Sequence, residues 1–479
     1  MFFVRKNHFL RPVEKTKLLQ LLNSLSAWEL RNLEQFLRSP FHNQRDDVVR
    51  LFEFYRKQHS RRSPDFSDAW AIRAVWPDKP PDTVDYPNLR SYLFKLTEKY
   101  LACEEIFGDE IVLKMRLAKA YERLNRDSNF EQTVRDIKGI LEKQPLRNPE
   151  YLRRQFELEY EIFDHVSSHR VEETNLEAVS RMLDAHYFAE KLKLACAQLS
   201  LNDVHPQDYD LSILPGVLDY LKEKTDWLSY PAIEVYYHAY LALTDQANEP
   251  NFQEVRRLLS DCQEQFTERE IGDIYRICLN YCIKRSNQGD SFYAREGLKL
   301  YRFGIEQGFL LTEGHLPHHT YINAAAFGIS LGEYDWAERF IEDYKNKVAR
   351  EHRESAYAFC LARLRYAQGN YREAMPLLAG FVTDNPYHFL IAKKMLCKIF
   401  YEGEEIAPLE SLLDSMRAYL QRHNKMDKDM KTHFKLFIDL MSRLVKLAPR
   451  DAKAKAKLSA GIEKLHLAVD RDWFLKQLK

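Results

Sequence analysis

A short pattern in the second half of the chain constrains the fold more than any other feature. Gly369 stands between two runs with helical spacing and is followed by Tyr371 two residues later and by Ala374 five residues later. The same pattern occurs once before, at Gly332, Tyr334 and Ala337. Glycine tolerates the left-handed backbone conformation that ends one helix and turns the chain into the next. The pattern therefore predicts helical hairpins.

The alanine of this pattern indicates how tightly each hairpin closes. It lies one turn into the second helix, where we expect it to face a small residue on the first helix. The small residue stands seven positions before each glycine, at Ala362 in one hairpin and Ala325 in the other. Two small side chains allow a close crossing, and the hairpin then presents an apolar face that only a neighbouring hairpin can bury.

The spacing of the pattern predicts a repeat array. Gly289 and Ala294 keep two of its members, and Gly403 follows Gly369 by 34 residues. Weaker copies begin at Asn129, Asn175 and Asn251, and the mean spacing is about 39 residues. Two-helix repeats with periods of roughly 34 to 47 residues form helical solenoids. The alternative is a non-repetitive α-helical bundle whose periodicity is accidental.

These positions resemble the tetratricopeptide repeat (TPR) family. The units at Gly332 and Gly369 match it well, the unit at Gly403 matches in part, and Tyr344 and Phe381 stand where the family has a small residue. The resemblance implies an all-α, TPR-like superhelix of hairpins. We expect a helical N-terminal subdomain in residues 1–105, repeats in residues 106–420 and capping helices in residues 421–479.

Composition supports a helical protein. Only 15 of 479 residues are glycine, about 3%, against a usual share of roughly 7%. No stretch approaches the roughly 18 apolar residues of a membrane span. The first 15 residues are too short and too interrupted by charge for a signal peptide. The seven cysteines form no CxxC pair, which favours a reducing cytoplasm and free thiols.

The N-terminal region resembles bacterial regulators that place a winged helix ahead of helical repeats. Trp76-Pro77 and a following helix with Arg90, Lys95 and Lys99 would fill the DNA-reading roles. The β-hairpin wing is missing, and residues 1–100 carry only 18 Lys and Arg against 12 Asp and Glu. We therefore expect a helical cap or partner-binding subdomain, with DNA contact as the alternative. A capping box at Ser26 and Glu29 predicts where one of its helices begins.

No residue pattern points to catalysis. The sequence lacks a P-loop, GxGxxG, HExxH, GxSxG and the kinase motifs. His315 and His319 have the spacing of metal ligands on one helix, but Pro317 is more naturally part of a helix start. Cys278 and Cys282 lie on an apolar helix face and are interpreted as core. We predict a non-enzyme without metal or cofactor.

The family resemblance points to a groove lined by the first helix of each hairpin. An aromatic and cationic groove suits a peptide with apolar anchors and an acidic group or C-terminal carboxylate. Alternatively, the aromatic rings pack against the next turn of the superhelix. Carried over to the three best units, the groove positions are Ile322 and Ile329; Phe359, Arg363 and Tyr366; and Lys393, Phe400 and Tyr401.

The sequence thus predicts a cytoplasmic protein–protein interaction scaffold or adaptor that binds a protein or peptide in a concave groove. Nucleic acid and membrane are not expected as partners. The alternative is a transcriptional regulator with DNA-contacting N-terminal helices and partner-sensing repeats. The basic stretch of residues 446–457 is interpreted as solvated surface ahead of a capping helix.

Overall fold

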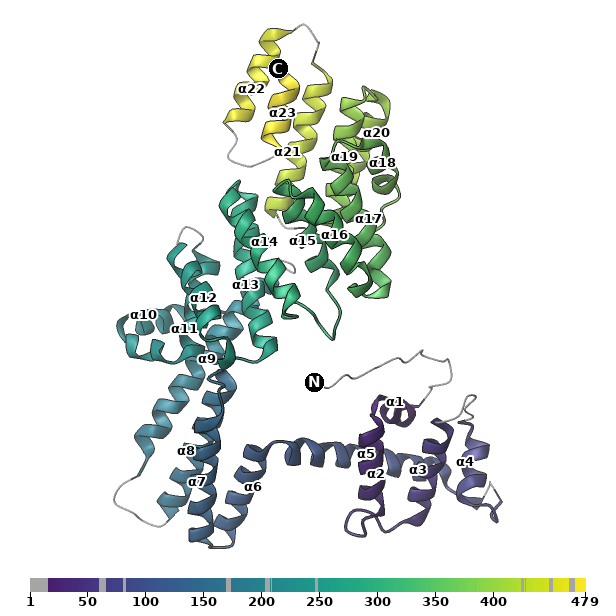
Figure 1. Ribbon diagram of the computed structural model, residues 1–479, viewed down its shortest axis with the longest axis vertical. Helices are drawn as coiled ribbons and strands as arrows, with labels where there is room; N and C mark the ends of the chain where they lie inside the picture. The colour runs from purple at the N-terminus through teal and green to yellow at the C-terminus, as the bar shows by residue number, and fades with distance from the viewer. Residues whose placement is uncertain are drawn as a thin grey trace. The chain divides into compact units, whose positions relative to one another are not determined.

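The computed structural model is all-α (Figure 1). It describes residues 16–59, 66–80, 83–168, 174–202, 207, 209–245, 249–383, 385–423, 426, 428–447, 451–464 and 470–479. Within these residues there are helices and one isolated bridge, between Thr312 and His315, but no strand. The start of the chain, residues 1–15, and parts of the segments 77–87 and 446–457 lie outside the described residues.

The chain forms two compact units, residues 1–143 and residues 144–479. The first unit contains α1 (Lys17–Ser24), α2 (Ala27–Arg38), α3 (Asp46–His59), α4 (Asp68–Val75), α5 (Tyr86–Gly108), α6 (Glu110–Arg123) and α7 (Asp127–Lys143). The predicted divisions after residues 105 and 420 fall within the last turns of α5 and of α20 (Ile406–Arg422).

One apolar core holds α1 to α5 together. Leu33, Phe52, Leu89 and Leu93 are among its fully buried members. The predicted capping box is confirmed: the hydroxyl of Ser26 accepts a hydrogen bond from the Glu29 N–H, and the Glu29 carboxylate accepts one from the Ser26 N–H at 2.6 Å. The N-terminal end of α2 is thus fixed by local sequence.

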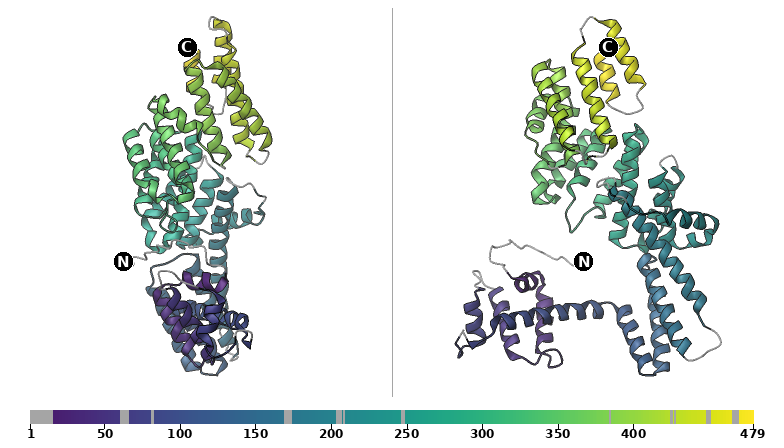
Figure 2. Two further views of the ribbon diagram at one scale, coloured as in Figure 1. Left: turned by 90° about the vertical axis from the view of Figure 1, so that its right-hand side faces the viewer. Right: turned by 180° about the vertical axis from the view of Figure 1, so that it is seen from behind.

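The second unit is a succession of helices, most of which contact the next helix along the chain (Figure 2). Its first part contains α8 (Pro149–Ser168), α9 (Leu176–Asn202), α10 (Leu214–Glu223), α11 (Pro231–Thr244), α12 (Glu249–Asp261), α13 (Glu268–Asn287) and α14 (Ser291–Glu306). Its second part contains α15 (His318–Ser330), α16 (Tyr334–Tyr344), α17 (Arg350–Ala367), α18 (Tyr371–Ala379), α19 (Pro386–Glu402), α20, α21 (Lys428–Val445), α22 (Ala452–Glu463) and α23 (Arg471–Leu478).

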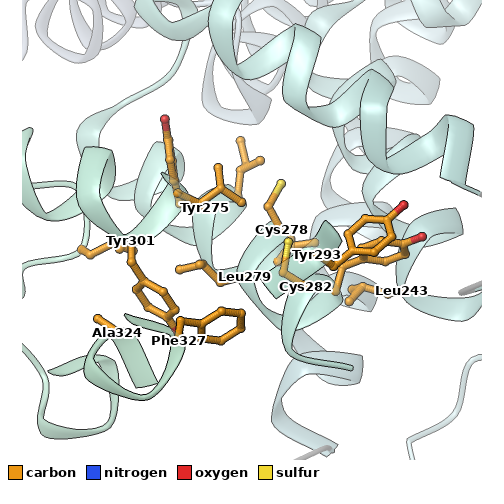
Figure 3. Packing of buried hydrophobic residues seen from close by; sticks show 14 of the residues in the cluster. Leu243, Tyr275, Cys278, Leu279, Cys282, Tyr293, Tyr301, Ala324 and Phe327 are labelled. Carbon is orange, nitrogen blue, oxygen red and sulfur yellow. The ribbon is translucent and has the colours of Figure 1, made fainter. Parts of the chain in front are cut away.

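The first helices of neighbouring hairpins also touch, as α15 and α17 do. One apolar cluster runs from Leu152 to Ile399, and its middle is filled by Tyr275, Tyr301 and Phe327 (Figure 3). A second cluster, from Leu390 to Leu478, joins α19 and α20 to the C-terminal helices. Within the second unit, apolar residues of successive helices are therefore buried against one another.

In the part of the chain that the structure describes, five hairpins close with the same turn. In each turn, one residue has a left-handed backbone, and its N–H donates a hydrogen bond to the carbonyl of the residue three positions earlier. The N–H of the residue that follows it donates to the carbonyl of the residue five positions before that donor. This is the hydrogen-bond pattern of the Schellman motif. The second helix begins two residues after the left-handed residue, and the fifth residue after it is buried. The left-handed residues are Asn125, Gly289, Gly332, Gly369 and Glu404.

One left-handed residue lies one position later than predicted, and a glycine packs closely in another hairpin. Gly403 has φ −86°, and Glu404 takes the left-handed position with φ 59°. In the α15/α16 hairpin, Gly328 also packs closely on the second helix: a Cβ on it would lie 3.5 Å from that of Ala337 and 2.6 Å from the Trp336 ring. Ala325, which was expected to face Ala337, is fully buried on the same helix.

Candidate functional site

The predicted groove residues divide into a buried and a half-buried set. Ile322 and Ile329 on α15 and Phe359 on α17 are only 3%, 8% and 0% exposed, and all three belong to the long apolar cluster. They contribute to the core and present no open surface to a ligand. The half-buried residues are Arg363 and Tyr366 on α17 and Lys393, Phe400 and Tyr401 on α19.

Arg363 is a half-buried cation without a counter-ion. Its guanidinium carbon lies 5.7 Å from the centroid of the Phe359 ring. No hydrogen bond or ion pair of Arg363 is present among the residues that the structure describes. Removal from water lowers the pKa of Arg363 from its ordinary value, which is the expected effect of an unpaired buried cation.

The charge of this arginine acts on the buried imidazole of His388. The Phe359 ring stacks on Phe381 at 4.6 Å and lies 5.2 Å from the ring of His388. His388 is 7% exposed, and burial, followed by the charges of Arg363, His318 and His319, lowers its pKa to about 4. All the charged groups that act on His388 are therefore cationic.

Lys393, the second predicted cation, lies on the neighbouring first helix. Its Nζ is 5.3 Å from the centroid of the Phe389 ring, which stacks on Tyr419 at 4.4 Å. Lys393 and Arg363 each cover a ring of their own helix, and no contact joins the two cations within the described part of the chain. The structure thus gives two separate cationic positions on α17 and α19.

The start of helix α23 lies against α19. The carboxylate of Asp470 is 2.7 Å from the Nζ atoms of both Lys394 and Lys398. Burial would raise the pKa of Asp470, but the two lysines outweigh it and hold that pKa well below its usual range. Lys398 is 7% exposed, and burial lowers its pKa despite the neighbouring carboxylate.

Trp473 of α23 also contacts α19. The Trp473 indole Nε1 donates a hydrogen bond to Glu402 at 2.6 Å, and its ring meets Tyr401 edge-on at 5.7 Å. The Nζ of Lys398 lies 5.2 Å from the centroid of the Trp473 ring. Tyr401, a predicted groove residue, therefore contacts the chain's own C-terminal helix.

Tyr366 faces the same region. Burial raises its pKa, and the negative charges of Glu402 and Asp470 add to this effect. Sequence reasoning found Tyr366 and Tyr401 but missed Lys394 and Lys398. Their i, i+4 spacing on a first helix was a signal for a shared anion, but no sequence pattern linked them to Asp470.

A cavity of about 430 Å³ lies elsewhere in the second unit, between α8, α9 and α13. Its buried carboxylate, Glu270, accepts hydrogen bonds from Asn148 Nδ2 at 2.7 Å and Lys193 Nζ at 3.0 Å. It also completes a capping box with Thr267 at the start of α13. These contacts satisfy Glu270 structurally.

One side-chain cluster has the composition of a metal site. Single ligand atoms of Glu234, His238 and Glu254 lie within 4.8 Å of one another. His238 Nδ1 is 2.8 Å from Asn251 Oδ1. However, the Arg257 guanidinium already contacts both carboxylates, at 2.6 Å for Glu254 and 3.4 Å for Glu234, and also pairs with Asp261 at 2.9 Å. We interpret the cluster as an ion-pair network between α11 and α12.

The residues considered from sequence for metal or thiol chemistry lie apart or in the core. His315 precedes α15 and its Nδ1 is 3.2 Å from the Glu313 carbonyl, so His315 and His319 do not share one helix. Cys278 and Cys282 are buried in the apolar cluster, and burial raises the pKa of Cys278 to about 12 (Figure 3).

The helix proposed to read DNA in the alternative hypothesis is α5. Arg90 on it is held 3.4 Å from Asp68 and lies over the Tyr86 ring, while Lys95 and Lys99 are exposed. The described chain continues from α5 directly into helix α6, so no β-hairpin wing follows.

Comparison with known proteins adds no relative: no protein-family model, curated protein or solved structure matches the chain. Among the described residues, no helix has both the length and the apolar character needed to cross a membrane.

Proposed function

We propose that this protein is a non-catalytic adaptor that binds an acidic segment of a partner protein in the cytoplasm. In this proposal the hairpins form a TPR-like solenoid, and the partner lies on the face that α15, α17 and α19 contribute. The observation that carries the proposal is Arg363, a half-buried guanidinium beside Phe359 and His388 that has no counter-ion in the described chain.

A cation in this position favours an anionic ligand. Removing a charge from water is costly unless it is paired and hydrogen-bonded. A carboxylate can form two parallel charge-assisted hydrogen bonds with a guanidinium, and such pairs are stronger than neutral hydrogen bonds. The neighbouring imidazoles of His318, His319 and His388 carry no negative charge that could compete. A partner carboxylate would therefore meet an unsatisfied donor.

Aromatic side chains next to the two cations supply apolar contacts. Tyr387 is 37% exposed, acts electrostatically on Arg363 and meets Phe434 edge-on at 6.1 Å. Phe389 lies under Lys393. Helical repeats commonly hold extended or helical peptides through such alternating apolar and charged contacts.

Affinity capture from a native extract, with nucleic acid retained, tests this function. The full chain is compared with Arg363→Gln and with the control Arg372→Gln, which changes an exposed arginine of α18. We expect wild type and Arg372→Gln to retain the same protein partners and Arg363→Gln to lose them. Retention of sequence-specific duplex DNA instead of protein would favour the regulator hypothesis and contradict the adaptor.

A further inference from the structure

The contacts of α23 with α19 indicate which ligand chemistry α19 can bind. We propose that the surface of α19 formed by Lys394, Lys398 and Tyr401 recognises a segment with a carboxylate followed three residues later by an indole. We further propose that the chain's own Asp470–Trp473 segment is a resident occupant that such a partner displaces. This inference rests on the proposed adaptor function and adds the ligand pattern and its regulation.

The contacts of the resident segment define the ligand chemistry. Asp470 lies 2.7 Å from both lysines, which are one helical turn apart on α19. Trp473 contacts the Tyr401 ring with its edge, donates its N–H to Glu402 and lies under the Lys398 ammonium. The surface thus binds a carboxylate, an aromatic ring and an N–H donor that stand at a fixed spacing in one segment.

A neighbouring anion stabilises the two lysines, whether it is Asp470 or a carboxylate of another molecule. Like charges at positions i and i+4 of a helix repel each other. Lys398 is 7% exposed and Lys394 is half-buried, so water screens this repulsion less than at an open surface. If Asp470 moves away from the two lysines, a carboxylate of a partner is the group that can pair with both ammonium groups and offset their repulsion.

The backbone at the start of α23 leaves the Asp470 carboxylate to the two lysines. Asp470 is left-handed, with φ 42°, a conformation that Asp adopts more readily than most non-glycine residues. It caps α23 without a side-chain hydrogen bond to that helix, and its carboxylate pairs with Lys394 and Lys398 instead.

Binding of a labelled peptide tests the exchange. A fluorescein-labelled peptide of residues 470–479, DRDWFLKQLK, is titrated with the full chain and with the full-length Asp470→Asn/Trp473→Ala variant. A tethered segment competes at an effective concentration of about millimolar. We therefore expect the variant to bind the peptide at least about tenfold more tightly than wild type. Adding Lys394→Ala and Lys398→Ala to the variant should abolish this gain.

Specific outcomes overturn the inference. Equal affinity of wild type and variant, or equal binding of a control peptide with its first Asp changed to Asn and its Trp to Ala, would show that this surface does not read the pattern. Loss of cooperative melting in both the double variant and Asp470→Asn alone would show that α23 is an inseparable part of the core.

Failure of this inference is distinguishable from failure of the adaptor function, because the peptide titration uses no partner. Partner capture that depends on Arg363, together with no peptide binding by the variant, would leave the adaptor and remove the displaceable segment. Peptide binding by the variant, together with partner capture that is insensitive to Arg363, would contradict the adaptor function at Arg363.

Discussion

Lys398 Nζ donates a hydrogen bond to the Asp470 carboxylate at 2.7 Å, although 72 residues separate the two in the sequence. Lys394 reaches the same carboxylate at 2.7 Å. These two contacts therefore connect α19 to the residue that precedes α23. Lys393, adjacent in sequence, points to the Phe389 ring instead and takes no part in this contact.

This geometry predicts which lysines hold α23. Lys394→Ala/Lys398→Ala should lower the amide hydrogen-exchange protection of residues 471–478 at least about tenfold, because the docked helix opens more often. Protection in α13 to α18 should not change. Lys393→Ala is the matched control and should leave α23 protected. Equal protection of α23 in the two variants would contradict the assignment.

The repeated turn predicts opposite effects of two substitutions. Gly332→Ala should destabilise the protein by about 1 kcal/mol, because alanine at φ 75° is strained although nothing lies within 4 Å of its Cβ. Glu404→Gly should stabilise it by a similar amount, because Glu404 holds φ 59°. Denaturant unfolding measures both free energies. Shifts of the same sign would contradict a shared turn.

Tight closure of the α17/α18 hairpin predicts that Ala374→Leu is destabilising. Ala374 is fully buried, so extra methyl groups must displace neighbours, at a cost of roughly 1–3 kcal/mol. Arg372→Gln, two residues earlier and exposed, should change the free energy of unfolding by less than about 0.5 kcal/mol. Similar melting temperatures of the two variants would argue against close packing at Ala374.

The same residues show what local sequence can predict. Gly332 and Gly369 indicated their turns because glycine adopts positive φ without strain. Ser26 and Glu29 indicated the start of a helix because their side chains form the hydrogen bonds of a capping box. Asn125 and Glu404 form the same turn and were not predicted, because neither residue is glycine, although Asn also occurs at this position in other helices.

The candidate site was harder to predict because it depends on contacts between distant segments. The family resemblance placed Phe359 in the groove but could not indicate that it packs against Phe381 and His388 and is fully buried. Likewise, the sequence predicted cations and rings for an acidic ligand on α19, but not that Asp470 already lies there. The helical periodicity of a sequence indicates which residues share one face of a helix. Which other segments cover that face depends on tertiary packing.

His388 makes stability depend on pH. Its pKa in the folded protein is lowered to about 4, against about 6.5 in the unfolded chain. Between these values the unfolded state binds more protons, so the contribution is complete above pH 6.5 and is lost as pH falls toward 4. The free energy of unfolding should drop between pH 7.5 and 5 by on the order of 1–2 kcal/mol more in wild type than in His388→Gln.

The control for this pH effect is His315→Gln, which changes an exposed histidine in the turn before α15. This variant should keep the wild-type pH dependence. If His388→Gln and wild type lose the same free energy between pH 7.5 and 5, the buried imidazole is not responsible.

The central claim is that cations on the first helices α17 and α19 bind an acidic segment of a partner. The most direct measurement is the affinity of a captured partner for wild type and for Arg363→Ala/Lys393→Ala, with melting temperatures recorded on the same samples. Neither cation has an ion pair in the described chain, so their removal strands no carboxylate. We predict at least about tenfold weaker binding, or 1.4 kcal/mol, with little change in melting temperature. Unchanged affinity in a variant that melts like wild type would contradict the claim.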